Sequence, residues 1–151
     1  MISVVHVVGK MNRGGLETFI MNVLRNINTR EFHCDILCTL PGAGDYDSEA
    51  AECGAILYSI GDAFQAHSGK MRFFFQYRDY VTWFKQHKYD VVHVHGSHAF
   101  DNSIAIMGAL KAGCKMVISH SHTNNGVHKV INALSAQYLQ KADIVRLACS
   151  H

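Results

Sequence analysis

Residues 3–27, SVVHVVGKMNRGGLETFIMNVLRNI, decide the fold. They begin with the nearly all-apolar run Ser3–Val8, which predicts a central strand buried on both faces. After Gly14 and Gly15, apolar residues recur every three or four positions from Leu16 to Ile27. This period predicts an amphipathic helix with one face packed on a sheet. A buried strand followed by such a helix is typical of the first βα unit of a parallel sheet.

The same alternation continues along the chain. We expect further strands at Phe32–Leu40, Ala55–Ile60, Asp90–His95, Lys115–His120 and Asp143–Cys149, and helices at Tyr46–Cys53, Lys70–His87, Ala99–Ala112 and Val130–Lys141. The glycine- and histidine-bearing segment Gly61–Gly69 is expected to be a loop. The pattern therefore predicts an α/β fold with a doubly wound, mostly parallel sheet, forming one domain over residues 1–151.

The composition excludes several classes of protein. With 14 Lys+Arg against 12 Asp+Glu, the formal charge of +2 is too balanced to predict a nucleic-acid partner or a polybasic membrane surface. A hydrophobic fraction of 48% excludes a disordered tail. The first residues lack the basic region of a secretory signal, and no apolar run is long enough to span a membrane. Together with an odd number of cysteines, five, this predicts a soluble protein of a reducing cytoplasm.

The loop after the first strand, Gly9–Gly15, is a candidate phosphate site. It ends at the N-terminus of a helix, where backbone amides and the helix dipole favour an anion. Its glycine spacing is neither the dinucleotide fingerprint nor a P-loop. A tight turn without a ligand is the alternative interpretation.

Histidines mark the ends of two later strands, in His93-Val94-His95 and His120-Ser121-His122. Residues two apart on a strand share a face, so each pair points to one side, with His95 and His122 at the carboxyl edge. The alternative is a structural role, in which His93 and His120 are hydrogen-bonded core residues that bind no ligand.

Such pairs are also typical of zinc ligands. The segment His93–His98 comes within one residue of the His-x-His-x-Asp-His motif of metallo-β-lactamase-like hydrolases, with Ser97 in place of the aspartate. A metal-dependent hydrolase using His93, His95, His98 and His122 is therefore one alternative, although no Asp or Glu accompanies either pair.

Three loops together resemble one family. The run Val4–Val8 followed by Gly14–Glu17, then Asp90–His95, then Ile118–Thr123, is similar to the N-terminal domain of retaining family 4 glycosyltransferases, in the branch that acts in capsular or exopolysaccharide assembly. The resemblance implies a Rossmann-like domain that forms the N-terminal, acceptor-side half of a GT-B enzyme. The paired glutamates of the family's C-terminal, donor-binding domain are absent from this chain. We therefore expect a truncated chain that is inactive alone.

The resemblance also implies the site residues. Gly14 and Gly15 would approach the donor diphosphate, and His122 would lie at the reaction centre as the catalytic residue. The acceptor cleft would be lined by His95, Ser97, His98, Thr123 and Asn124.

The implied reaction transfers a sugar from a nucleotide sugar to a carbohydrate or lipid-linked acceptor with retention of configuration, without a metal or other cofactor. The implied location is the cytoplasm, at the inner face of the membrane. The run Phe73-Phe74-Phe75 cannot all face one side of a helix, and it predicts either an ordinary exposed residue or a peripheral membrane contact. A non-catalytic carbohydrate-binding domain is the third function class that the sequence leaves open.

Overall fold

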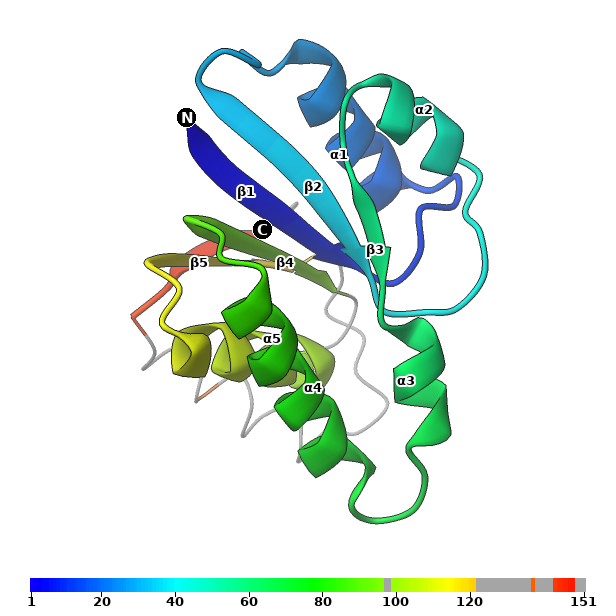
Figure 1. The fold of residues 1–151 in the computed structure, drawn as a ribbon, viewed down its shortest axis with the longest axis vertical. Coiled ribbons are helices and arrows are strands. Elements are labelled where there is room, and N and C mark those ends of the chain that lie inside the picture. The colour runs from blue at the N-terminus through cyan, green and yellow to red at the C-terminus, as the bar shows by residue number, and fades with distance from the viewer. Residues whose placement is uncertain (97–98, 122–136, 138–142, 149–151) are drawn as a thin grey trace.

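A computed structural model of the chain describes residues 1–96, 99–121, 137 and 143–148. Its centre is a six-stranded sheet in the order β3-β2-β1-β4-β5-β6, in which every pairing is parallel. The strands are β1 (Ile2–Val8), β2 (Phe32–Cys38), β3 (Leu57–Ser59), β4 (Val91–Gly96), β5 (Met116–Ser121) and β6 (Val145–Ala148). The doubly wound parallel sheet predicted from the sequence is confirmed (Figure 1).

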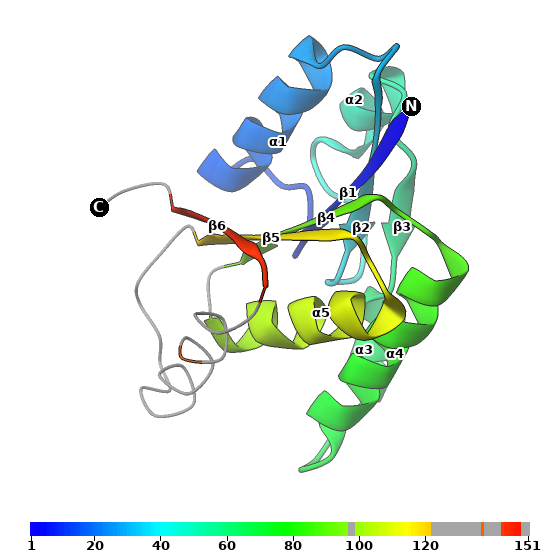
Figure 2. The same cartoon turned by 90° about the vertical axis from the view of Figure 1, so that its left-hand side faces the viewer.

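Helices cover both faces of the sheet. On one face lie α1 (Gly15–Asn26) and α2 (Asp47–Glu52), and on the other lie α3 (Gly61–Ala66), α4 (Arg72–Gln86) and α5 (Ala99–Ala112) (Figure 2). The chain changes face after β3, because the next strand, β4, pairs with β1 on the side away from β2. The strand order therefore reverses between β1 and β4, which is where ligands bind in open α/β sheets.

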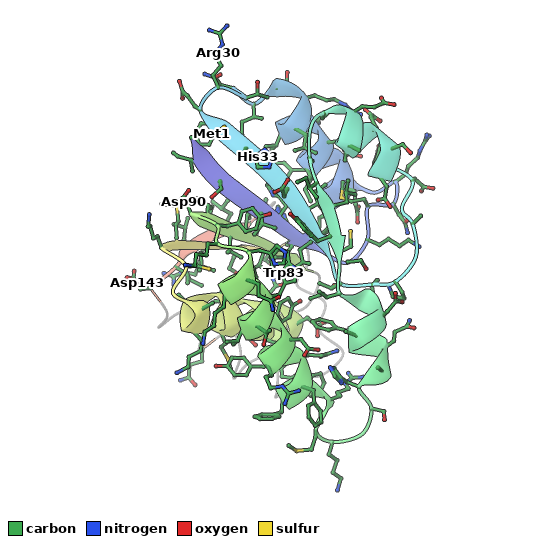
Figure 3. The ribbon with its side chains drawn as sticks, viewed as in Figure 1. Met1, Arg30, His33, Trp83, Asp90 and Asp143 are labelled. Atoms are coloured by element: carbon green, nitrogen blue, oxygen red, sulfur yellow. The ribbon has the colours of Figure 1, made fainter. Side chains whose placement is uncertain are left out.

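Each face of the sheet has its own apolar core, because neighbouring residues of a strand point to opposite faces. The core under α4 and α5 includes Val5, Val7, Tyr80, Trp83, Phe84, Val92, Val94 and Ile106. The core under α1 and α2 includes Val8, Met11, Ile20, Met21, Leu24 and Ile36. Figure 3 labels Trp83, whose ring is buried between α4 and the sheet.

Helices α4 and α5 pack closely at one glycine. A Cβ on Gly108 of α5 would lie 2.6 Å from the Cβ of Tyr80 on α4, which is closer than carbon atoms approach one another. Only a residue without a side chain lets these two helices meet at this distance.

The amino edge of the sheet is tied together by Asp90, which is labelled in Figure 3. Its carboxylate accepts hydrogen bonds from the Ser3 amide at 3.0 Å and the Ser3 hydroxyl at 2.9 Å, and Lys115 lies 3.3 Å away. These contacts join the start of β1 to the residues that precede β4 and β5.

Most predicted elements agree with the structure to within two residues, and the helix Ala99–Ala112 agrees at both ends. Strands β2 and β3 end earlier than expected, at Cys38 and Ser59. After β2 the Leu40 amide donates to the Gly9 carbonyl, so the chain turns toward the β1 loop instead of continuing the strand. The predicted helix Val130–Lys141 lies outside the described residues, apart from residue 137.

The expected loop Gly61–Gly69 is wrong over its first six residues, which form α3. The backbone of Gly61 packs so closely on Leu40 and Pro41 that a Cβ there would overlap the Leu40 carbonyl group and the Pro41 nitrogen. Phe64 then packs edge-on against Tyr80, with ring centroids 5.0 Å apart. Tertiary packing rather than local propensity therefore forms this helix.

The three consecutive phenylalanines of α4 lie on different sides of the helix, as the helical period requires. Phe73 packs edge-on against Phe100 with centroids 4.5 Å apart, whereas Phe74 is 54% exposed. Among the described residues, the helices are all too short or too polar to cross a membrane.

Candidate functional site

A pocket of about 650 Å³ opens at the carboxyl ends of β1 and β4. Its floor is formed by the last residues of these strands, including Val8 and Val94. The start of α1 forms one wall, and α3, α4 and α5 form the opposite side. The pocket therefore occupies the point where the strand order reverses.

The polar lining of this pocket carries charges of both signs. Lys10 and Arg72 contribute cations, and Glu17 and Asp101 contribute carboxylates. The Arg72 guanidinium carbon lies 4.3 Å from the centre of the Phe73 ring, a cation–π contact that limits its freedom. A lining with both donors and acceptors suits a neutral, polyhydroxylated ligand better than a strongly charged one.

Gly96, the last residue of β4, lets an amide side chain reach the pocket. Asn102 of α5 is buried and lines the pocket, and a Cβ on Gly96 would overlap its side-chain amide. An amide group offers both a donor and an acceptor, so Asn102 is suited to bind a hydroxyl group. Sequence reasoning missed this residue, because its place in the pocket depends on how closely α5 approaches the end of β4.

A second polar element of the pocket is His67, in the connection between α3 and α4. Its Nε2 lies 2.6 Å from a carboxylate oxygen of Asp79, and its ring stacks on Phe75 with centroids 5.2 Å apart. These two contacts fix the ring, so His67 presents a defined edge to the pocket.

The loop after β1 is anchored at its middle. The Met11 side chain is fully buried, and the Met11 carbonyl accepts a hydrogen bond from the Tyr46 amide at 2.8 Å. The Arg13 amide donates to Asp45 at 3.1 Å. The loop therefore approaches α1 from a fixed position.

Gly14 is the N-cap residue of α1 and has extended backbone angles, with no side-chain capping bond. The Glu17 carboxylate in the first turn lies close over Gly14 and interacts favourably with the positive end of the helix. Among the residues that the structure describes, none has a heavy atom within 4 Å of a Cβ built on Gly15. The geometry suits the approach of an anion, provided that Glu17 moves aside.

Four histidines gather on the α1 face of the sheet beside the pocket: His6 from β1, His93 and His95 from β4, and His120 from β5. Each is at most 7% exposed. The prediction that His93 and His95 share a face is confirmed, with ring centroids 3.9 Å apart. His120 stacks on His93 at 5.4 Å, and Phe19 of α1 packs edge-on against His120 at 5.3 Å.

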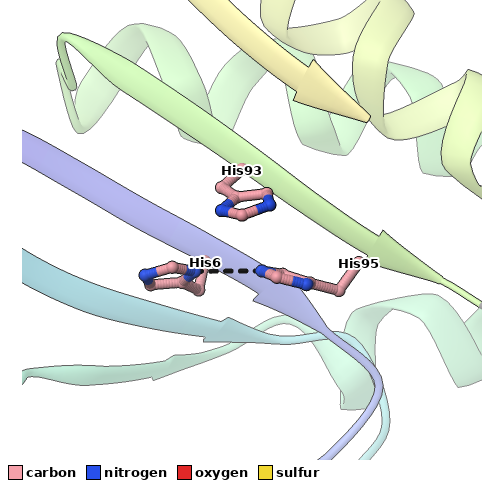
Figure 4. A group of neighbouring side chains, drawn as sticks. All are labelled: His6, His93 and His95. Atoms are coloured by element: carbon pink, nitrogen blue, oxygen red, sulfur yellow. Dashed lines mark hydrogen bonds between the residues drawn. The ribbon is translucent and has the colours of Figure 1, made fainter. Parts of the chain in front are cut away.

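His6 and His95 are joined directly, since the Nδ1 atom of His6 lies 3.0 Å from the Nε2 atom of His95 (Figure 4). Burial lowers the pKa of His6 to about 4 and also lowers the pKa of His120. Both imidazoles are therefore neutral near pH 7, because the buried site disfavours a positive charge. Sequence reasoning missed His6, whose place beside His93 follows only from the register of β1 on β4.

Of the site residues predicted from the sequence, Gly14, Gly15 and His95 are described by the structure. Gly14 and Gly15 start α1, whose next residues, Leu16 and Glu17, line the pocket, and His95 contributes to the lining as well. Ser97, His98, His122, Thr123 and Asn124 lie outside the described residues.

The chain is similar to known proteins over most of its length. The model of the family described as Glycosyltransferase Family 4 matches residues 13–151. EpsF of Bacillus subtilis (strain 168), which is named as a glycosyltransferase, is 28% identical over 122 residues, or 81% of this chain and 30% of EpsF. The capsular polysaccharide biosynthesis glycosyltransferase CapH of Staphylococcus aureus is 25% identical over 134 residues, or 89% of this chain and 34% of CapH.

The fold is similar to a solved structure, the apo form of the lipopolysaccharide outer core galactosyltransferase WaaB. The TM-score is 0.55 at 16% sequence identity, covering 79% of this chain and 32% of WaaB. The chain thus spans about a third of the length of the proteins that it matches.

Proposed function

Because the chain belongs to Glycosyltransferase Family 4, whose model matches residues 13–151, we propose that the protein transfers a sugar from a nucleotide-sugar donor to a carbohydrate or lipid-linked acceptor in polysaccharide biosynthesis. We assign this chain to the N-terminal, acceptor-side half of the enzyme. The membership favours the glycosyltransferase over the two other function classes left open by the sequence, a hydrolase and a non-catalytic binding domain.

The observation that carries this proposal is the pocket at the carboxyl ends of β1 and β4. Its lining combines the Asn102 amide with cationic and anionic side chains, which supports binding of the hydroxyl groups of a sugar acceptor. His95 is assigned to this acceptor cleft, together with Ser97, His98, Thr123 and Asn124.

The donor is assigned to the other side of the reaction centre. The N-terminus of α1 at Gly14 and Gly15 supports an approach to the donor diphosphate, because helix N-termini stabilise anions. A second, donor-binding domain would supply the remaining contacts, in keeping with the share of EpsF and CapH that this chain spans.

We assign His122, which directly follows β5 in the sequence, as the catalytic residue that would bind the donor sugar or stabilise the charge that develops as the diphosphate departs. Preorganised donors and the α1 dipole can supply this stabilisation without a metal ion. We also propose that the transfer retains the anomeric configuration of the donor sugar.

The location that fits this activity is the cytoplasmic face of a membrane, where lipid-linked acceptors are found. The exposed side chains of Met71 and Phe74 at the start of α4 support a peripheral contact there.

The test uses the protein with its donor-binding domain, incubated with a panel of nucleotide sugars and with carbohydrate and lipid-linked acceptors. We expect one donor to give a glycosylated product, with the same anomeric configuration as the donor by NMR. The 151-residue chain alone should give no product, because both substrates must be held together for transfer. Transfer by the chain alone would contradict the assignment of a separate donor domain, and an inverted product would contradict retention.

A further inference from the structure

Three imidazole rings meet at the centre of the sheet, from His6 on β1 and from His93 and His95 on β4 (Figure 4). Each ring offers one nitrogen, and these three nitrogens lie within 4.8 Å of one another. All three residues are buried, and they are positioned by the parallel register that pairs His6 with His93. The arrangement is therefore built into the most central pair of strands.

Burial of these three imidazole rings destabilises the fold unless their nitrogens gain a compensating interaction. The residues that alternate with these histidines, Val5, Val7, Val92 and Val94, point to the opposite face of the sheet. On the histidine face, the ring of Phe19 packs against His93 and His95. The Nε2 atom of His6 is buried and has no hydrogen-bond partner among the residues that the structure describes. An imidazole nitrogen buried without a partner destabilises the fold, because it has lost its contacts with water.

We propose that His6, His93 and His95 bind one divalent transition-metal ion of the zinc type. Neutral imidazole is a preferred ligand of zinc, cobalt and nickel. Zinc lies about 2.0–2.1 Å from each ligand nitrogen, so two ligands of a tetrahedral ion are roughly 3.4 Å apart. The 3.0 Å between Nδ1 of His6 and Nε2 of His95 is close to this separation. The His93 nitrogen lies within 4.8 Å of the other two, so its ring must move closer to them to complete the site.

The ion would join β1 to β4 beneath the pocket. Phe19 of α1 covers the cluster, with its ring centroid 5.9 Å from that of His95 and 6.4 Å from that of His93. This cover restricts access to the site, so we assign the ion a structural role. The inference is independent of the proposed sugar transfer, which needs no metal in this account.

The alternative for the same atoms is a hydrogen bond in which His6 and His95 share one proton and no metal binds. The two cases differ in how many nitrogen lone pairs they use. A metal ion requires the lone pairs of both nitrogens, whereas a shared proton occupies one of them.

The test uses the 151-residue chain without a polyhistidine tag, stripped with a chelator and titrated with zinc against a chromophoric chelator at neutral pH. We expect one equivalent of zinc to bind and to raise the melting temperature, since a ligand that binds only the folded state stabilises it. Cobalt(II) should bind at the same site and give the visible spectrum of a nitrogen-ligated tetrahedral ion, without a thiolate charge-transfer band. This absence separates the cluster from Cys34, Cys38, Cys53 and Cys114.

The matched variants are His6→Gln and His95→Gln, with His33→Gln as the control. His33 lies on β2, outside the cluster, with its Nε2 atom 3.0 Å from a carboxylate oxygen of Asp35. Each cluster variant should lower zinc affinity about 100-fold or more, because loss of an outer-shell partner alone costs roughly 10–100-fold. The control should bind zinc as the wild type does.

Circular dichroism identifies any variant that does not fold, and the cobalt spectrum of the wild type then decides the question. Failure of the wild type to bind one equivalent, a thiolate band in the cobalt spectrum, or unchanged affinity in a folded cluster variant would each overturn the proposal. None of these measurements uses a sugar donor or acceptor, so the outcome does not depend on the transfer activity.

Discussion

The Nδ1 atom of His6 lies 3.0 Å from the Nε2 atom of His95, and this contact joins β1 to β4 where the strand order of the sheet reverses. His95 also contributes to the lining of the pocket. A buried polar contact thus lies directly behind the surface that we assign to the acceptor. A substitution of His6 is expected to change the orientation of His95 in the pocket, because buried hydrogen-bonded groups fix each other's orientation.

Replacement of Gly15 by alanine tests the assigned diphosphate contact. A Cβ at this position meets no heavy atom of the described part of the chain within 4 Å, so the variant should fold with an almost unchanged melting temperature. The added methyl group would occupy the space through which the diphosphate approaches α1. We expect a higher KM for the nucleotide sugar, measured by steady-state kinetics of the enzyme with its donor-binding domain.

The control for this prediction is Asn26→Ala at the opposite end of α1, where the residue is exposed. Its KM for the donor should equal that of the wild type. An unchanged KM in Gly15→Ala would remove Gly15 from the donor site.

Replacement of Gly108 by alanine tests the close approach of α4 and α5. In an ordinary helix, alanine in place of glycine stabilises by about 0.5–1 kcal/mol. At Gly108 the sign should reverse, because the new Cβ would lie 2.6 Å from the Cβ of Tyr80 and force the helices apart. We expect a loss of about 1–3 kcal/mol in the free energy of unfolding, measured by urea denaturation. A stabilised variant would show that the helices separate without cost.

The Asp90 carboxylate gives the fold a dependence on pH in the acid range. The Ser3 amide, the Ser3 hydroxyl and Lys115 together lower the pKa of Asp90 to about 2. Its folded pKa lies below the unfolded value, so its contribution to stability is complete above the unfolded pKa and is lost as the pH falls toward 2. The free energy of unfolding should therefore differ between wild type and Asp90→Asn at pH 6, and the difference should shrink as the pH approaches 2.

The exposed residue Glu52 provides the comparison for this series. The variant Glu52→Gln should follow the wild-type stability curve more closely than Asp90→Asn at every pH. A difference for Asp90→Asn that stays constant from pH 6 to pH 2 would mean that the Ser3 and Lys115 contacts do not favour the charged carboxylate.

His120 is expected to contribute to the stability of the fold and not to the reaction. Its ring is buried between His93 and Phe19, so His120→Ala removes packing on both sides. We expect a loss of about 1–3 kcal/mol in the free energy of unfolding, with kcat close to the wild-type value. A stable His120→Ala variant with a steeply lowered kcat would instead place this ring in the reaction.

The sequence predicts those parts of the fold that depend on local period. The small residues of Ala99–Ala112, followed by Gly113, give that helix at both ends, and the two-residue period of a single strand places His93 and His95 together. The position of His6 beside them depends on the register between β1 and β4, two strands that are far apart in the chain. Helix α3 was missed because it is formed by contacts with the Leu40–Pro41 backbone and with Tyr80.

The measurement that tests the central claim most directly is sugar transfer by the enzyme with its donor-binding domain, at saturating donor and acceptor, in wild type, His122→Ala and His33→Gln. If the protein is a glycosyltransferase with His122 at its reaction centre, His122→Ala should lower kcat by roughly 10²–10³, as does the loss of one preorganised donor. The melting temperature should stay close to that of the wild type, and His33→Gln should transfer sugar at the wild-type rate. A kcat near the wild-type value in His122→Ala would contradict the assignment of the reaction centre, and the absence of transfer from every nucleotide sugar tested would contradict the proposed function itself.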